Sequence, residues 1–232
     1  MGKVKIKKHS TIIDMTAMSD VTVLLLTFFM LTSTFLQKEP VQVVTPPSVS
    51  EAKVPDEKLV QILVGPDGKV YLNLTGARDS SVLASDKFRA EVLNRAYGRY
   101  CETHPKAPKL TAIQQQEFSK LNTFGVPFDK LTQWIEMPME RRDEFLKNEG
   151  GIPIAMSIKD GQPNEFQIWL KAIKEVMQSH DLGKDLTGGQ GVAIKASQYS
   201  PYSLVQVIMD NLQTERLNKF TLMTSLKAEE EE

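Results

Sequence analysis

Residues 17–36 are the feature that most constrains the fold, because they read AMSDVTVLLLTFFMLTSTFL and contain one charged side chain, Asp20. As an α-helix, such a run is about 30 Å long, enough to cross the hydrocarbon core of a bilayer. A cleaved secretory signal has a shorter apolar region and ends at a small-x-small site, which residues 33–38 do not offer. We therefore predict a retained transmembrane helix over residues 12–36.

The basic residues beside this run predict its orientation. Lys38 is the only basic residue close to the carboxyl-terminal end of the run. The short segment 1–11 contains four lysines, namely Lys3, Lys5, Lys7 and Lys8. Because basic flanks stay in the cytoplasm, the pattern predicts a cytoplasmic amino terminus. In a bacterium this makes the chain a single-pass inner-membrane protein, with everything after about residue 37 in the periplasm.

Composition excludes several classes of function. The 232 residues contain 28 Lys and Arg against 29 Asp and Glu, a net charge of −1, with no basic stripe after residue 10, which argues against nucleic-acid binding. One cysteine, Cys101, excludes an internal disulfide framework and a cysteine-based metal site. The chain also lacks serine-hydrolase and zinc-protease motifs, and Cys101 and His104 lack support as a nucleophile and base. We expect no enzyme activity, no metal and no cofactor.

Asp20 is the residue on which the predicted function depends. An acid inside an apolar helix costs about 2.5 to 3.5 kcal/mol on insertion scales, so it needs a partner, a wet cavity or a proton. At 100° per residue, it falls within about 40° of one line with Thr16, Thr27 and Thr34. This stripe predicts a face packed on other helices or a narrow polar path, in which Asp20 takes up and releases a proton. The alternative is an acid near the helix start that reaches the membrane interface.

Residues 13–21 read IDMTAMSDV, are followed by LLLTFFMLTSTF, and resemble the start of the transmembrane helix of the ExbD/TolR family. Thr16 and Asp20 fall on the two polar positions of the family motif, so the resemblance implies the proton-carrying role for Asp20. The sequence departs from the motif at Ala17, where proline is usual, and at Ser19, where an apolar residue is usual.

A second resemblance lies near the carboxyl end. Residues 192–196, 200–202, 205–212 and 219–224 look like the closing strand, helix and strand of the same family. Ser197 stands where an acid is common in the family. The fold implied is one transmembrane helix followed by a periplasmic α/β (α+β) domain at 59–226, with a small mixed sheet and packed helices.

The resemblance implies the function of a motor subunit. Family members couple the proton motive force to TonB-dependent transport, working as a homodimer inside a ring of a polytopic ExbB-like partner and passing energy to a TonB-like protein. Within the family, the alternative is a TolR-like role in envelope stability. Its partners would be TolQ-like and TolA-like proteins, and it would contact peptidoglycan. A flagellar-stator resemblance is weaker, because no long peptidoglycan-binding domain of the OmpA type follows the helix. Outside the family, the alternative is a bitopic anchor whose soluble domain binds a ligand or peptidoglycan.

Two segments flank the start of the predicted periplasmic sheet. Residues 37–58 contain four prolines and read as an extended linker, whose valines Val41, Val43 and Val44 either pair with a sheet edge or belong to a disordered tether. Residues 59–64 and 69–74 surround the turn Gly65-Pro66-Asp67-Gly68 and predict a β-hairpin. A short acidic tail is expected at 227–232.

A helix-rich stretch follows the hairpin and reads as an insertion at about 80–150. Its expected boundaries are a cap at Thr111, a stop at Gly125, a first turn at Pro138 and a stop at Gly150-Gly151. Its aromatic residues Phe118, Phe124, Phe128 and Trp134 are expected to form its core.

An amphipathic helix is predicted after the insertion. Residues 163–182 place a row of apolar side chains on one side, which fits packing on a sheet. This row consists of Phe166, Trp169, Leu170, Ile173, Val176 and Met177. We expect His180, at the carboxyl end of this helix, to act as a cap rather than a catalytic group.

Overall fold

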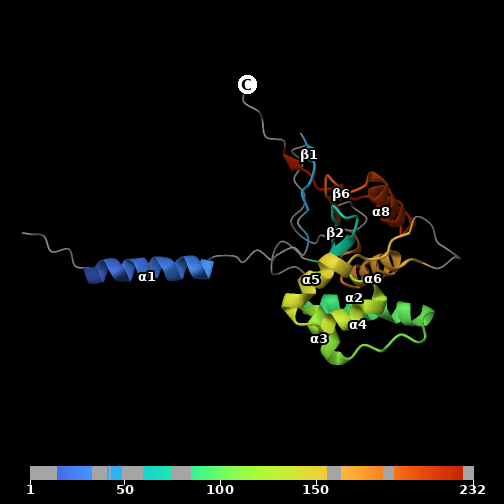
Figure 1. Ribbon diagram of the computed structural model, residues 1–232, viewed down its shortest axis with the longest axis horizontal. Coiled ribbons are helices and arrows are strands. Elements are labelled where there is room, and N and C mark those ends of the chain that lie inside the picture. Colours follow the sequence, from blue (N-terminus) through green and yellow to red (C-terminus); the bar gives the residue numbers. More distant parts are fainter. Residues whose placement is uncertain are drawn as a thin grey trace, which may run out of the picture. The chain divides into compact units, whose positions relative to one another are not determined.

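The computed structural model describes residues 15–32, 41, 43–48, 60–74, 85–155, 163–184 and 191–226. The chain divides into two compact units, Met1–Lys38 and Glu39–Glu232 (Figure 1). The predicted tails at 1–11 and 227–232 lie outside the described residues.

The first unit contains one described helix, α1 (Met15–Thr32). Its 18 residues span about 27 Å along the axis, because each helical residue rises about 1.5 Å. By length and composition, it is the described helix that is apolar enough to cross a membrane. All of its described residues are exposed. The apolar helix predicted from the sequence is therefore confirmed, and the remainder of the predicted span 12–36 lies outside the described residues.

The second unit is built on a mixed five-stranded sheet with the order β4-β3-β2-β5-β6. The predicted hairpin is confirmed, because β2 (Val60–Val64) and β3 (Val70–Asn73) pair antiparallel around the turn. Gly68, with φ of 75°, supplies the left-handed conformation that this turn requires. β5 (Val192–Ala196) lies parallel to β2, and β6 (Thr221–Leu222) lies parallel to β5, which places both predicted closing strands in the sheet.

Two amphipathic helices follow the patterns read in the sequence. α6 (Glu165–Ser179) begins with a capping box of Asn164 and Gln167, and α8 (Tyr202–Thr214) follows β5. Trp169 of α6 is fully buried, with its ring 4.6 Å from that of Phe124 in the sheet. The predicted packing of this helix on the sheet is therefore confirmed.

Four helices lie in the described part of the segment between the hairpin and α6, residues 85–155. They are α2 (Asp86–Thr103), α3 (Ala112–Ser119), α4 (Phe128–Glu136) and α5 (Met139–Glu149). The predicted cap at Thr111 is confirmed as a capping box with Gln114, Pro138 directly precedes α5, and Gly150 ends α5. α2 packs along α6, so the segment shares one core with the rest of the second unit.

One predicted boundary, the helix stop at Gly125, is wrong. Gly125 follows β4 (Thr123–Phe124), a two-residue strand that pairs with β3. A Cβ atom at this position would lie 2.3 Å from Cδ1 of Tyr71, so glycine is needed there for close packing against β3. β4 comes from the helical segment, which thereby covers the outer edge of the hairpin.

The described part of the predicted linker is extended and docked on the second unit. The backbone N–H of Gln198 donates a 2.8 Å hydrogen bond to the carbonyl oxygen of Val44. β1 (Pro47–Ser48) then pairs parallel with β7 (Ser225–Leu226). Residues 47–48 thus form a separate two-stranded sheet with β7, whereas Val44 makes one backbone contact, and the pairing predicted for Val41, Val43 and Val44 with a sheet edge stays a prediction.

Candidate functional site

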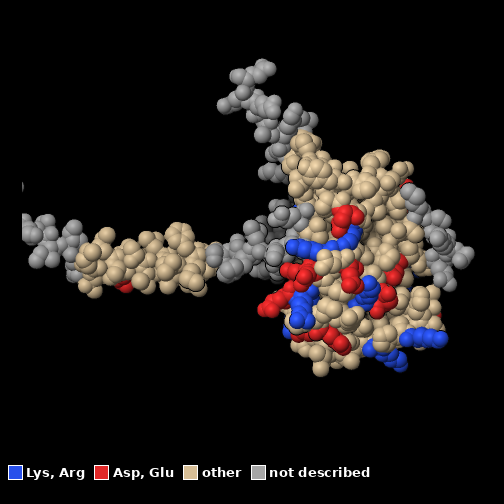
Figure 2. All heavy atoms as spheres, in the orientation of Figure 1, with Lys and Arg blue, Asp and Glu red and all other residues tan. Residues whose placement is uncertain are grey.

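Asp20 lies in the amino-terminal half of α1 and is the acid of that helix. Figure 2 shows red, acidic atoms on the otherwise tan surface of this helix. The other seventeen residues of Met15–Thr32 are uncharged, so the carboxylate is the only formal charge along the described helix. No hydrogen bond or ion pair joins Asp20 to another side chain within the residues that the structure describes.

The helical geometry of α1 aligns three of the four predicted site residues. Thr16 lies one turn before Asp20, and Thr27 lies about 10 Å further along the axis on the same side. Thr34, the fourth predicted residue, lies outside the described residues. The described stripe thus combines one carboxyl group and two hydroxyl groups on an apolar helix.

Four hydroxyl groups of α1 donate hydrogen bonds to backbone carbonyl oxygens of the same helix, namely those of Ser19, Thr22, Thr27 and Thr32. Thr27 Oγ1 donates a 2.9 Å hydrogen bond to the carbonyl oxygen of Leu24. Ser19 Oγ donates a 2.9 Å hydrogen bond to the carbonyl oxygen of Thr16, and Thr22 Oγ1 donates a 2.8 Å hydrogen bond to the carbonyl oxygen of Ser19. A hydroxyl that donates in this way keeps lone pairs and can still accept a hydrogen bond. The hydroxyl group of Thr27 can therefore accept a further hydrogen bond while its own proton stays bonded to Leu24.

Ser19 and Thr22 form a second polar row that was not included in the predicted site. Together with Met15, Thr16 and Met18 they line a shallow hollow on the surface of α1. The signal was present in the sequence, because Ser19 replaces an apolar residue at this position of the family motif. The row broadens the polar face at the amino-terminal end of the helix.

The histidines and the cysteine of the second unit do not form a catalytic cluster. His180 ends α6, and its Nε2 lies 3.2 Å from Glu91 Oε2 of α2, so it sits at the predicted helix end and also contacts a neighbouring helix. His104 stacks on Tyr100 with ring centroids 4.4 Å apart, and Cys101 is a half-buried free thiol. Within the described ranges, no group of three His, Cys, Asp or Glu side chains could hold a metal ion.

Glu165 is a titratable residue that sequence reasoning missed. It is the first residue of α6, and its Oε2 accepts a 2.9 Å hydrogen bond from the backbone N–H of Phe128, the first residue of α4. Burial, with a smaller contribution from the negative charge of Asp129, raises the pKa of the Glu165 carboxyl to about 7, although the hydrogen bond from Phe128 acts in the opposite direction. In the sequence it resembles an ordinary acid in a first helical turn, because the contact with α4 is tertiary.

The described parts of the chain thus combine one apolar helix, long enough to cross a membrane, with a mixed-sheet α+β region. Residues 7–109 match the family model of the biopolymer transport protein ExbD/TolR. This part of the chain is therefore an ExbD/TolR family domain, which confirms the resemblance seen in the helix motif. The family is membrane-associated and indicates an energy-coupling subunit of biopolymer transport with membrane partners of the ExbB/TolQ kind.

The family model matches the amino-terminal part of the chain. It includes α1, the hairpin and α2, and it ends in the loop that follows α2. The closing strand, helix and strand lie beyond it. Neither the curated proteins nor the solved structures contain a match to this chain.

Proposed function

We propose that this protein is the proton-carrying subunit of an inner-membrane motor of the ExbB–ExbD type, with Asp20 as the protonatable group. The observation that carries the proposal is the single acid of α1, placed on a hydroxyl-lined side of an apolar helix within the family-matched range. A charged carboxylate in hydrocarbon is costly, so Asp20 is stable there when protonated or when it faces a polar path. Thr16, Thr27 and Thr34 supply polar neighbours on that path.

The proposed energy source is the transmembrane proton gradient. One elementary charge crossing the membrane carries about 2.3 kcal/mol per 100 mV, which a subunit can use only if its movement is coupled to a partner. All described residues of α1 are exposed in this chain, so the helix has a complete surface to offer to partner helices. We propose an ExbB-like ring as that partner, a homodimer of this chain within the ring, and a TonB-like protein as the recipient of the energy.

The proposed orientation places the amino terminus in the cytoplasm and the second unit in the periplasm. The support for it is the group of lysines before α1, because basic flanks remain on the cytoplasmic side. Cysteine labelling with a membrane-impermeant reagent tests it, since Cys101 is the only cysteine of the chain. An exposed variant such as Thr103→Cys in a Cys101→Ala background should react from the periplasmic side only.

Replacement of Asp20 tests the proton-carrying role. Asp20→Asn should abolish energised uptake while leaving membrane insertion and assembly with the ring protein intact. Phe29→Leu is the control, because Phe29 lies on the opposite side of the helix from Asp20, and this variant should retain uptake. If Asp20→Asn cells still energised uptake across the outer membrane, the proton-carrier role would be wrong.

A TolR-like role is the second candidate, because the matched family includes both ExbD and TolR. In that case the partners would be TolQ-like and TolA-like proteins, with peptidoglycan as a further ligand. A deletion strain separates the two candidates. Failure to take up iron chelates supports the ExbD role, whereas sensitivity to detergents supports the TolR role.

A simple membrane anchor is the third candidate. It predicts that the protein is purified from detergent without a polytopic ring protein, whereas both motor candidates predict a stable complex. Co-purification therefore distinguishes an anchor from a motor subunit before any transport assay.

A further inference from the structure

Glu165 joins two helices through one hydrogen bond. Its Oε2 lies 2.9 Å from the backbone nitrogen of Phe128, so the carboxyl group at the start of α6 holds the start of α4. The side chain is half-buried, and within the described residues no cation lies at ion-pair distance from it. Loss of the proton therefore leaves a negative charge with one neutral donor and little water.

The position of Phe128 links this joint to the aromatic core. The Phe128 ring is 1% exposed and stacks on Trp169 of α6, with centroids 4.9 Å apart. The Phe128 ring also stacks on Tyr100 of α2 at 4.8 Å, and the His104 ring stacks on Tyr100 at 4.4 Å. A small movement of the start of α4 therefore changes the contact between Phe128 and Trp169.

Among the described residues, the hydrogen bond from Phe128 favours the ionised form of Glu165, and burial of the carboxyl group outweighs it. Asp129, the next residue of α4, contributes a negative charge that opposes ionisation of Glu165. Tyr100 is neutral, because burial and the charge of Glu165 raise the pKa of its phenol. His104 is the remaining titratable group of this stack, and it lies beyond Tyr100.

We propose that Glu165 is a proton-responsive joint of the second unit: proton uptake by its carboxyl group tightens the packing of α4 on α6, and proton release loosens it. Protonation removes the half-buried charge and its repulsion with Asp129, while the carbonyl oxygen of the neutral acid can still accept from Phe128 N. The transition is centred near neutral pH, so it responds to modest acidification of the surrounding compartment. The joint acts within the second unit and does not depend on proton transfer through Asp20.

Trp169 provides an optical readout of the joint. The chain has two tryptophans, so the variant Trp134→Phe leaves Trp169 as the only one. In the full-length protein in detergent, its emission maximum and its quenching by acrylamide are recorded across neutral pH. We expect one sigmoidal transition with a midpoint near 7, and its disappearance in Glu165→Gln. Asp129→Asn should retain the transition and lower its midpoint, because it removes the opposing charge.

Two controls decide between Glu165 and other groups. His104→Gln should leave the transition in place, and a transition lost in His104→Gln but kept in Glu165→Gln would overturn the proposal. If Trp134→Phe does not fold, the amide resonance of Phe128 in the otherwise unaltered chain is followed by NMR over the same range. A Phe128 shift that titrates identically with and without Glu165→Gln would also overturn it.

Discussion

The hydroxyl group of Tyr71 on β3 donates a 3.0 Å hydrogen bond to the carbonyl oxygen of Leu146 in the last part of α5. Both residues are buried, and the adjacent N–H of Ile152 donates to Val70 at 2.9 Å. Lys69 Nζ adds a third contact, at 3.0 Å from the carbonyl oxygen of Asn148. The hairpin that belongs to the matched family domain and the end of the helical segment are thus held together by polar contacts.

Tyr71→Phe should destabilise the second unit by about 1 kcal/mol, because it keeps the ring and removes one buried hydrogen bond. The free energy of unfolding of the full-length protein in urea measures this change. Tyr199→Phe is the matched control, since Tyr199 is 71% exposed and its replacement should have almost no effect. Equal effects of the two variants would contradict a stabilising contact between β3 and α5.

Gly98 should be replaceable by alanine with a gain in stability of roughly 0.5 to 1 kcal/mol, because glycine is unfavourable inside a helix. It lies within α2, and an added Cβ atom would meet nothing within 4 Å. Thermal unfolding should show a higher midpoint for Gly98→Ala. Gly125→Ala should show the opposite, since its Cβ would lie 2.3 Å from the ring of Tyr71.

Gly98, inside a helix, and Gly125, packed against Tyr71, show which features of the fold the sequence could predict. Gly125 follows an apolar pattern in the sequence and resembles a helix stop, but its role depends on Tyr71, which is far away along the chain. Local signals were reliable elsewhere: the turn before Lys69 and the cap at Thr111 depend only on neighbouring residues, and both are confirmed. The pairing of β4 with β3 had no local signal, because a two-residue strand has no periodicity.

The titratable residues also differ in whether the sequence alone could predict them. The acid of α1 stands out in the sequence because a charge in an apolar run is costly wherever the helix packs. Glu165 of the second unit does not stand out in the sequence, because it differs from an ordinary helix-start acid only through its contact with Phe128 in another helix. Chemistry that depends on composition along one helix can be predicted, whereas chemistry that depends on a tertiary contact cannot.

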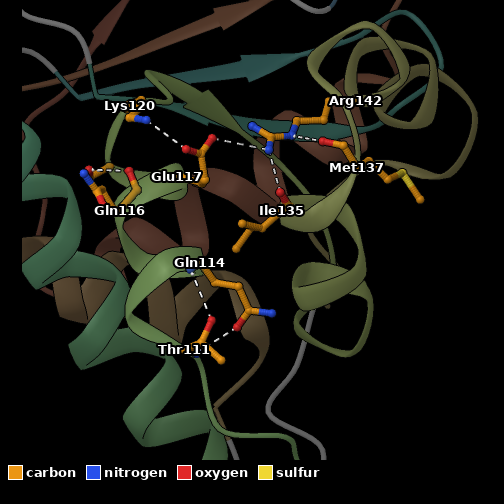
Figure 3. A network of polar contacts seen from close by, with 9 residues as sticks. Thr111, Gln114, Gln116, Glu117, Lys120, Ile135, Met137 and Arg142 are labelled. Carbon is orange, nitrogen blue, oxygen red and sulfur yellow. Dashed lines mark hydrogen bonds and ion pairs between the residues drawn. The ribbon is translucent and has the colours of Figure 1, made fainter.

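Arg142→Met should destabilise the helical segment by about 2 to 3 kcal/mol, since it leaves two carbonyl groups without a charged donor. The guanidinium of this buried arginine donates to the carbonyl oxygens of Met137 at 2.7 Å and Ile135 at 2.5 Å (Figure 3). Its Nη2 also lies 3.7 Å from Glu117 on α3, so it connects three helices. Urea unfolding of Arg142→Met, compared with the exposed neighbour Arg141→Met, measures the difference. Similar losses in both variants would show that the network in Figure 3 contributes little.

The stability of the second unit should fall as the pH rises from about 4.5 towards about 7, and Glu165 should be responsible. The pKa of its carboxyl is raised in the folded state, so between these values the folded protein binds more protons than the unfolded chain. The stabilisation that Glu165 contributes is therefore greatest in acid, and it is lost as the pH rises through the folded-state pKa. Urea unfolding of the full-length protein at a series of pH values should show this slope. It should be reduced in Glu165→Gln and unchanged in Glu140→Gln, because Glu140 is exposed on α5. A slope that is the same in all three proteins would assign the acid stabilisation to other groups.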